Sequence, residues 1–298
     1  MRMPLFQKWR CDFTNVTAEA AAAHLAAAPP RRGVHAEALP ITRLTARVAG
    51  VPRLWAAAVD LDEQDVVFVR AVPAGSLEQV IFRMDALRVL EEHGVRVVNS
   101  PRTIEHGVDK YYAAARLEAA GIATPATVVC ERFEDAMEAF AALGGDVVAK
   151  PLFGSEGRGI VRVSDEDTAY RVFRALELGR YVYCVQVFVD HGHEDIRAFV
   201  VGDAVIAAMR RVGSHWKTNA AQGARGEALA VDDGLAELSV RAAHALGAEH
   251  AGVDLFDDGE GGYCVVEVNT IPGWRALGAA TGIDAGQALV DHVLAGRS

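Results

Sequence analysis

The chain has 298 residues and carries 40 acidic against 30 basic side chains, which gives a formal net charge of −10. A chain of this length can form one large unit or two to three smaller domains with cores of their own. The acidic balance argues against non-specific nucleic-acid binding, although a phosphate ligand needs only local positive charge. No stretch of about 18 residues is free of charged or polar breaks, so we expect no membrane span.

The N-terminal segment and the cysteines are typical of a cytoplasmic protein. Thr17–Ala28 is rich in alanine, but Glu19 and His24 interrupt it, so we expect a helix rather than a secretion signal. The four cysteines are far apart without CxxC spacing, which indicates neither a zinc site nor a disulfide framework. We expect no nucleic-acid or membrane partner, and the sequence leaves a homo-oligomer open.

Up to about residue 100, the pattern predicts a small α/β domain. A strand-like segment, Ile41–Ala49, follows an irregular start, and the β-branched run Asp65–Arg70 is typical of a buried strand. Leu77–His93 has helical spacing, and Val95–Asn99 is the next expected strand. Strand, helix and strand in this order indicate an α/β unit.

From there to about residue 188, helices alternate with strands. A short strand separates two helices, and three further strands follow, with a helix before the last. In chain order these elements are helix Gly107–Ala120, strand Thr127–Cys130, helix Phe133–Leu143, strand Asp146–Leu152, strand Gly159–Ser164, helix Asp165–Leu178 and strand Tyr181–Val189.

The remaining residues predict two β-hairpins around a helix. Ile196–Arg211 is expected to turn back at Gly202 and Asp203. A helix over Leu235–Gly247 follows. Strands Ala251–Phe256 and Tyr263–Asn269 then flank the turn DDGEGG.

Lys150 comes directly before the glycine-rich segment GSEGRG, residues 154–159. Glycines let backbone N–H groups approach an anion closely, and a lysine adds charge. The order differs from a P-loop, in which the lysine follows the glycines. The segment lies between two strands, so it indicates a flap over phosphates; a plain glycine hairpin beside an edge lysine is the alternative.

The strongest constellation is Asp254 with Glu267 and Asn269. The midpoint of the DDGEGG turn places Asp254 opposite or nearly opposite Glu267, and Glu267 shares a strand face with Asn269. Two facing carboxylates repel unless a cation lies between them, and three oxygen donors suit Mg²⁺ together with phosphate oxygens. The alternative is a solvated acidic hairpin, which the apolar flanking strands disfavour.

Three weaker patterns complete the candidate site. Asp195 and Arg197 open a strand, and arginine can bind a phosphate or carboxylate through a two-pronged fork. Lys217 and Asn219 follow in a loop, and Lys110 opens a helix. Structural ion pairs and surface positions are the alternatives for each.

The segment IPGWR follows the Asn269 strand, and its Pro-Gly turn would bring Trp274 and Arg275 near a substrate. An ordinary turn with a packed tryptophan is the alternative.

Taken in order, these motifs resemble the ATP-grasp superfamily and, within it, the RimK-type amino-acid ligases. The shared pattern runs from residue 95 to the C-terminus as N-x-P, DK, GI-x-x-P-x-T, KP, GSxGxG, Q-x-F, D-x-R, K-x-N, GVD and EVN-x-x-PG. The ending VNTIPGW looks most like ligases that add glutamate to tetrahydromethanopterin-type cofactors. The resemblance implies an α/β (α+β) ATP-grasp fold with an N-terminal domain, residues 1–100, and two subdomains, 101–188 and 189–298, that grip ATP between them.

The resemblance also implies roles for individual residues. Those that contact ATP are Lys110, Lys150, the flap residues Gly154, Ser155, Gly157 and Gly159, the hinge residues Gln186, Val187 and Phe188 beside adenine, and Asp195. The catalytic candidates are Arg197, Lys217 and Asn219. The metal ligands are Asp254, Glu267 and Asn269, which would hold Mg²⁺, with Mn²⁺ as a substitute.

Two positions depart from the family pattern. Relatives often have an acidic residue where this chain has Val187, which leaves backbone groups to bind adenine. Relatives often have an R-x-N motif where this chain has Lys217-Thr218-Asn219, which keeps the charge but loses the arginine fork.

The implied reaction is ATP-dependent joining of a carboxylate to an amine through an acyl phosphate. The amine is expected to be L-glutamate, and the acid a small cofactor of the tetrahydromethanopterin or methylofuran kind, or a protein. An ATP-grasp kinase and a non-catalytic ATP-binding protein stay open as alternatives. A dinucleotide oxidoreductase is disfavoured, because no strand–GxGxxG–helix unit occurs near the start of the chain.

Overall fold

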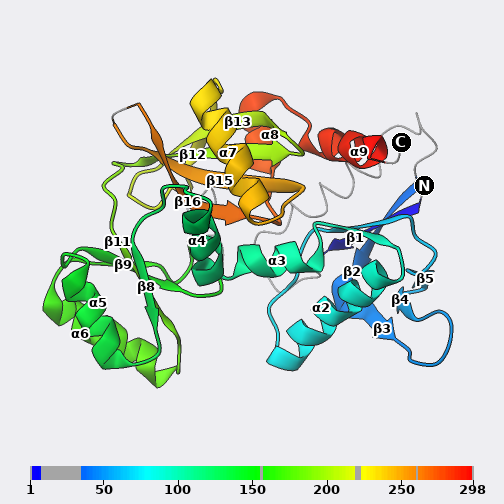
Figure 1. Ribbon diagram of the computed structural model, residues 1–298, viewed down its shortest axis with the longest axis horizontal. Coiled ribbons are helices and arrows are strands. Elements are labelled where there is room, and N and C mark those ends of the chain that lie inside the picture. Colours follow the sequence, from blue (N-terminus) through cyan, green and yellow to red (C-terminus); the bar gives the residue numbers. More distant parts are fainter. Residues whose placement is uncertain (1, 8–34, 155–156, 219–222, 260, 297–298) are drawn as a thin grey trace.

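The computed structural model describes residues 2–7, 35–154, 157–218, 223–259 and 261–296. Within these residues, three larger sheets follow one another along the chain, each with helices packed on it, and one small sheet extends the first unit (Figure 1). This is the predicted α/β architecture. The helix predicted over Thr17–Ala28 lies outside the described residues. No helix in the described part is both long and apolar enough to cross a bilayer.

The N-terminal unit is built on a parallel sheet with strand order β2-β1-β6-β7. The predicted strands around residues 65–70 and 95–99 and the helix between them are confirmed. The elements are β1 (Arg2–Gln7), β2 (His35–Pro40), β6 (Val66–Val69), α2 (Leu77–Glu92) and β7 (Arg96–Val98), with β3 (Leu44–Ala46), β4 (Leu54–Ala56) and β5 (Val59–Asp60) in the small sheet.

The strand predicted over Ile41–Ala49 is correct only in its middle third. Ile41–Arg43 forms a 3₁₀ turn, and only Leu44–Ala46 is extended. The turn places the Ile41 side chain in the core, where it is fully buried. Burial of Ile41 and Leu44, three residues apart, therefore reflects a tight turn rather than the alternation of a strand.

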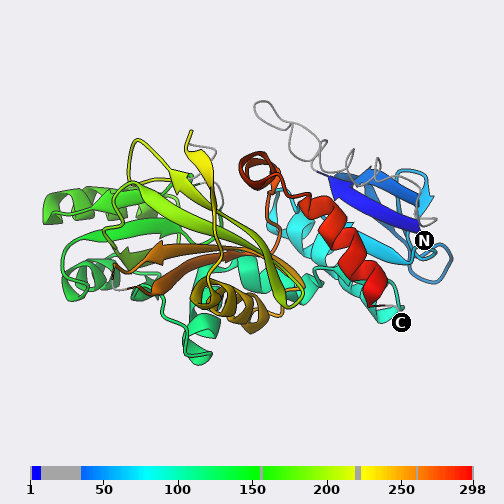
Figure 2. The ribbon, with the colours of Figure 1, turned by 90° about the horizontal axis from the view of Figure 1, so that it is seen from above.

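Strand β6 is buried on both faces, as its apolar sequence predicts for a parallel strand. Val67 and Val69 pack in one core with α2. Val66 and Phe68 pack on the opposite face, in a core that includes α9 (Ala285–Ala295). Seen from above in Figure 2, α9 runs across the N-terminal unit, so the C-terminal helix helps to close the first sheet.

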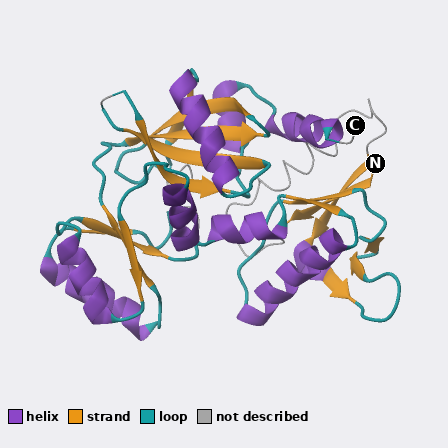
Figure 3. Cartoon of the chain, in the orientation of Figure 1, coloured by secondary structure: helices purple, strands orange, loops and turns teal. Residues whose placement is uncertain are grey.

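The central unit is an antiparallel sheet of order β10-β9-β11-β8 with two helices on its outer side (Figure 3). All predicted strands and helices of this unit are confirmed. The elements are β8 (Thr127–Cys130), α5 (Phe133–Ala142), β9 (Val147–Pro151), β10 (Val161–Val163), α6 (Glu166–Leu178) and β11 (Tyr183–Val187).

The helix predicted over Gly107–Ala120 is two helices, α3 (Pro101–Val108) and α4 (Lys110–Ala119). The chain breaks at Asp109, whose carboxylate accepts hydrogen bonds from the amides of Tyr111 and Tyr112 and caps α4. The break puts Lys110 in the first helical position. Ala113 and Leu117 of α4 pack with residues of the C-terminal sheet. The helix therefore supports that sheet, although it precedes the central unit in the chain. The division of the chain into domains at 1–100, 101–188 and 189–298 stays a prediction.

The C-terminal unit is an antiparallel sheet of order β14-β13-β12-β15-β16, and both predicted hairpins are confirmed. Its elements are β12 (Glu194–Val201), β13 (Ala204–Val212), β14 (Arg225–Leu229), α7 (Asp233–Ala245), β15 (His250–Asp257), β16 (Tyr263–Asn269), α8 (Arg275–Thr281) and α9.

Side chains alternate along β12, so one face of this sheet is apolar, and the other is apolar at one end of the strand and polar at the other. Ile196, Ala198 and Val200 pack under α7 and α4. Phe199 and Val201 point the other way and pack with α8 and α9. Asp195 and Arg197 share that second face at the opposite end of the strand, so polar side chains gather where the sheet approaches the central unit.

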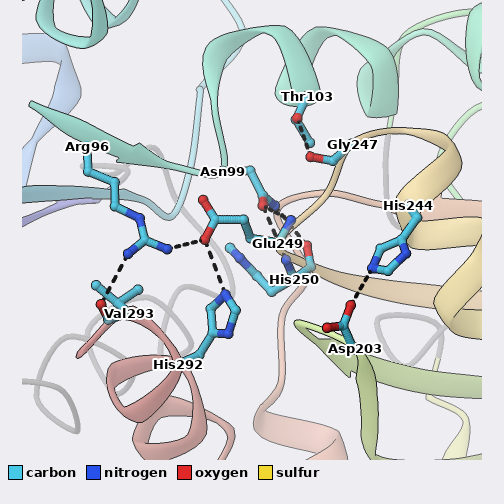
Figure 4. Close-up of polar contacts among 10 residues, drawn as sticks. All are labelled: Arg96, Asn99, Thr103, Asp203, His244, Gly247, Glu249, His250, His292 and Val293. Atoms are coloured by element: carbon cyan, nitrogen blue, oxygen red, sulfur yellow. Dashed lines mark hydrogen bonds and ion pairs between the residues drawn. The ribbon is translucent and has the colours of Figure 1, made fainter. Parts of the chain in front are cut away.

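Asn99 connects the N-terminal unit to the C-terminal sheet (Figure 4). It is fully buried, its Nδ2 donates to the carbonyl oxygens of His250 and Thr270 at 2.8 and 2.6 Å, and its Oδ1 accepts from the amides of Glu249 and His250. Nearby, the guanidinium of Arg96 donates to Glu249 Oε2 at 2.5 Å. The junction is therefore a hydrogen-bonded interface.

Replacing Asn99 with alanine should destabilise the protein by about 2–4 kcal/mol, because buried carbonyl and amide groups from two loops lose their partners. Urea unfolding at pH 7 measures the loss. Gln64→Ala is the control, since the Gln64 side chain donates a single hydrogen bond within the described residues, to the carbonyl of Asp60. Equal losses for the two variants would contradict the role given to Asn99.

Candidate active site

A cleft with an empty volume of about 660 Å³, partly open to solvent, lies between the central and C-terminal sheets. Lys150 and Gln186 line it from the central sheet, and Asp195, Arg211 and Glu267 from the C-terminal sheet. The cleft thus brings together residues from both predicted subdomains.

A second hollow of about 460 Å³ shares Lys150, Gln186 and Glu267 with the first and adds Lys110. Lys150 Nζ donates to Gln186 Oε1 at 2.5 Å, and Gln186 Nε2 donates to Thr127 Oγ1 at 2.8 Å. Burial lowers the pKa of Lys150, and the nearby charge of Glu267 opposes that shift. Lys150 is therefore held by Gln186 between the two hollows.

The predicted facing of the two carboxylates is confirmed. Asp254 on β15 pairs in register with Glu267 on β16, and Gly252 pairs with Asn269. Glu267 and Asn269 are two residues apart and share a face. The three oxygen-bearing residues therefore belong to one side of the ribbon.

Asp254 is 6% exposed and is held by two arginines. Arg197 donates to both carboxylate oxygens through Nε and Nη2, and Arg211 Nη2 lies 3.0 Å from Oδ1. Burial pushes the pKa of Asp254 up, but the charges and hydrogen bonds of Arg197 and Arg211 outweigh it and hold that pKa below its usual value. Asp254 is thus an anion at neutral pH.

Arg211 is a central residue of the site that sequence reasoning missed. It is 4% exposed, and its Nε and Nη2 donate to the two oxygens of Asp195 at 2.6 and 2.5 Å. Thr218 Oγ1 donates to the same carboxylate at 2.6 Å. Counting pairs from the turn at Gly202 would place Arg210 opposite Asp195; an irregularity between Phe199 and Val200 shifts the register by one residue and sets Arg211 there instead.

The donor set around Glu267 fits a magnesium ion. The side chains of Glu267 and Asn269 make no hydrogen bond or ion pair with another described residue, so their oxygens are available as ligands. Among the described residues, no three His, Cys, Asp or Glu side chains converge on one metal position. Two carboxylates and an amide are too few for a cage made by protein alone, but they suit Mg²⁺, which retains waters and takes phosphate oxygens.

Two lysines hold the ends of the glycine-rich segment. Lys110 Nζ donates to the carbonyl of Gly154 at 2.9 Å, and Lys217 Nζ donates to that of Ile160 at 2.6 Å. Gly157 and Gly159 have φ of 70° and 72°, a region that glycine adopts without strain. The predicted site residues Ser155 and Asn219 lie outside the described residues.

The hinge segment lines the cleft as predicted, but two of its amide groups are already used. The N–H of Val187 donates to Ala126 O at 2.9 Å, and that of Phe188 donates to Asp146 O at 3.0 Å. Val189 donates to no described residue. A backbone donor for a base in the cleft is therefore Val189, one residue beyond the predicted hinge positions.

The segment after β16 packs Trp274 against the core, and contact of Trp274 or Arg275 with a substrate stays a prediction. Trp274 is buried, and its ring packs edge-on against Phe199 with centroids 6.1 Å apart. Arg275 begins α8 and is exposed. The packed tryptophan of the alternative is therefore observed.

Gly252 keeps space for Arg197. A Cβ at this position would lie 3.0 Å from both Arg197 Nη1 and Pro272 Cβ. Gly252→Ala should therefore displace Arg197 from Asp254 and lower kcat about tenfold to 100-fold with the fold intact, because small misplacements at a reacting centre are costly. Gly273→Ala is the control, since a Cβ there meets nothing within 4 Å. Equal kcat values for the two variants would contradict this.

Comparison with known proteins places the chain in a family. The pattern of the RimK-like ATP-grasp domain matches residues 107–293. A tetrahydromethanopterin:alpha-L-glutamate ligase of Methanocaldococcus jannaschii is 35% identical over 241 residues, covering 78% of this chain and 80% of the relative. A probable alpha-L-glutamate ligase of Rhodopirellula baltica is 32% identical over 276 residues, covering 91% of this chain and 67% of the relative.

Solved structures agree on the fold. The ATP-grasp ligase PsnB, complexed with a minimal precursor, Mg and ADP, aligns with a TM-score of 0.72 at 21% identity, over 99% of this chain and 97% of that one. A D-alanine–D-alanine ligase from Bacillus anthracis complexed with ATP gives 0.69 at 16% identity, over 99% and 96%. The chain therefore belongs to the RimK-like ATP-grasp family of ligases.

Proposed function

We propose that this protein joins the amino group of L-glutamate to a carboxylate of a second substrate, at the expense of ATP and through an acyl phosphate. The observation that carries the proposal is the ribbon of Asp254 and Glu267 facing Lys150 across the cleft. The proposed amine follows from the glutamate ligases that the chain resembles. The acid is a small cofactor, such as the tetrahydromethanopterin named for the Methanocaldococcus jannaschii relative, or a protein, a class that the precursor peptide bound by the structural neighbour PsnB supports.

ATP would lie with its base at the hinge and its phosphates under the glycine-rich segment. The unused N–H of Val189 supplies a donor to the base, and Val148 and Ile160 offer apolar contact in the same cleft. Lys110 and Lys150 would offset phosphate charge, and Lys217 would hold the flap against the cleft.

Glu267, Asn269 and Asp254 would hold Mg²⁺, and Mn²⁺, which accepts the same oxygen ligands, would substitute. The bound ion would neutralise part of the negative charge on the phosphates of ATP. Asp254 would share its carboxylate between this role and the two arginines that already hold it.

The reaction would run in two steps, formation of an acyl phosphate and then of the amide. A carboxylate oxygen of the acid attacks the γ-phosphorus, ADP leaves, and an acyl phosphate forms. The ammonium group of glutamate loses a proton to solvent, the resulting amine attacks the acyl carbon, and inorganic phosphate leaves with a second proton from the nitrogen as the amide forms. Arg197 and Arg211 would stabilise the negative charge that develops beside Asp254.

A screen of acids with glutamate and Mg-ATP tests this function. The ligase should release ADP and phosphate in equal amounts only when both acid and amine are present. A kinase would instead make ADP without phosphate and without any amine. ATP binding with no turnover would support the non-catalytic alternative. Cytoplasmic location and self-association stay predictions.

A further inference from the structure

Arg70 extends from the N-terminal sheet to the turn that follows the metal ribbon. It comes directly after β6, at the carboxyl end of a parallel sheet, where ligands commonly bind. Its Nη2 donates to the carbonyl of Pro272 at 2.7 Å, and its guanidinium carbon lies 3.7 Å from the centre of the Trp274 ring. Arg70 therefore touches the chain just three residues beyond Asn269.

The charge of Arg70 lacks a counterion among the described residues. Its Nε and Nη1 atoms are shielded from water and have no hydrogen-bond partner, although they carry three N–H groups between them. Burial lowers the pKa of Arg70 to about 9, so it keeps its proton at neutral pH. An unpaired buried charge is costly, and proteins retain one where it has a use.

A second unpartnered polar group lies in the same region. Nδ1 and Nε2 of His250 are both buried without a partner. Burial, and then the charge of Arg70, lower the pKa of His250 to about 3, so the ring is neutral and offers one donor and one acceptor. Two neighbouring side chains with unmet hydrogen bonds are unusual in a protein interior and indicate a polar ligand.

This region adjoins the reacting centre. Pro272, the acceptor of the Arg70 hydrogen bond, lies against Gly252, and a Cβ on Gly252 would be 3.0 Å from both Pro272 Cβ and Arg197 Nη1. Arg197 in turn holds Asp254. Arg70 is therefore connected to the Arg197–Asp254 pair through Pro272 and Gly252.

We propose that Arg70 is a specificity-determining residue that binds a non-reacting carboxylate of a substrate, belonging either to the incoming amino acid or to the acid. The inference rests on the proposed ligase function. Guanidinium donors match a carboxylate in geometry and charge, and the anion would neutralise the buried cation. His250 would add a hydrogen bond to the same group.

The test measures binding by calorimetry to the full-length protein saturated with Mg²⁺ and a non-hydrolysable ATP analogue. L-glutamate is the probe for the amino-acid arm and glutarate for the acid arm. Arg70→Met should weaken the affinity for one probe by about tenfold or more, and Arg70→Lys should restore part of it, with affinity for the ATP analogue unchanged. Arg83→Met is the control, because Arg83 is also buried and donates to a backbone carbonyl, that of Pro73.

A purely structural arginine would behave differently. If Arg70 serves a ligand, Arg70→Met leaves the Tm unchanged or raises it, because an unpaired buried charge is removed. A lower Tm with both probe affinities unchanged, or a wild-type protein that binds neither probe, would overturn the inference. Wild-type binding that depends on Arg70, with no phosphate release for any acid with glutamate, would instead refute the ligase function and leave the carboxylate site standing.

Discussion

Replacing Glu267 with glutamine is expected to reduce amide formation by about three orders of magnitude, the loss of roughly 4 kcal/mol of charge stabilisation at the phosphates. Glu267 pairs in register with Asp254, and its side chain makes no ion pair or hydrogen bond with another described residue. Its carboxylate is therefore free for a cation, and its loss should weaken binding of Mg-ATP in particular. Steady-state kinetics across a range of Mg²⁺ concentrations measures the effect.

The fold should tolerate this change, because Glu267 is only partly buried and holds no described partner. We expect the free energy of unfolding to change by less than about 1 kcal/mol. Glu227→Gln is the control, since Glu227 pairs with Arg225 on edge strand β14, away from the cleft. Full activity of Glu267→Gln at low Mg²⁺ concentration would remove the metal assignment.

Replacing Arg211 with alanine should damage stability and activity together. The change leaves Asp195 with only Thr218 and takes one of two arginines from Asp254, in an environment where both carboxylates are buried. Breaking a buried ion network in this way costs about 3–5 kcal/mol. Denaturant unfolding at pH 7 measures the stability, and amide formation should be lost with it.

Arg210→Ala is a closely matched control for this variant. Arg210 is the preceding residue on β13, but it points to the other face and pairs with Glu194 at a partly exposed position. Its removal should cost less than about 1 kcal/mol. Equal losses of stability for the two variants would show that Arg211 does not hold a buried network.

The stability lost in Arg211→Ala should depend on pH. The arginines hold the pKa of Asp254 below its usual value in the folded protein. The stability that this pairing contributes is fully present above the unfolded pKa of about 3.9 and is lost as the pH falls through the lower folded pKa. The difference between wild type and variant should therefore shrink below about pH 4.

The position of a turn in the sequence predicts closely which residues of a β-hairpin face each other in the site. The glycine-rich turn between β15 and β16 sets Asp254 within one residue of the position facing Glu267, and a register irregularity between Asp254 and Leu255 then brings the two into direct pairing. The same counting from the turn at Gly202 would give Arg210, because a register shift between Phe199 and Val200 is what sets Arg211 opposite Asp195. Arg211 is harder to recognise, because arginine at that position belongs to no short motif.

Other features could not be predicted, because they depend on contacts between distant residues or on a choice that local sequence leaves open. Trp274 is buried by Phe199 and Arg70, which are far away in the chain. Asp109 can occupy the interior of a helix or cap one, so the sequence does not reveal that the predicted helix divides at residue 109. The unpaired charge of Arg70 likewise appears only once the N-terminal and C-terminal units are assembled.

Transfer of oxygen from the acid to phosphate tests the proposed chemistry most directly. An acid that supports glutamate-dependent ADP release is labelled with ¹⁸O in its carboxylate, and the phosphate product is analysed by mass spectrometry. An acyl phosphate attacked at carbon by the amine leaves one labelled oxygen in each phosphate. Phosphate without the label would mean that the carboxylate never bonded to phosphorus, and the ligase mechanism would be wrong.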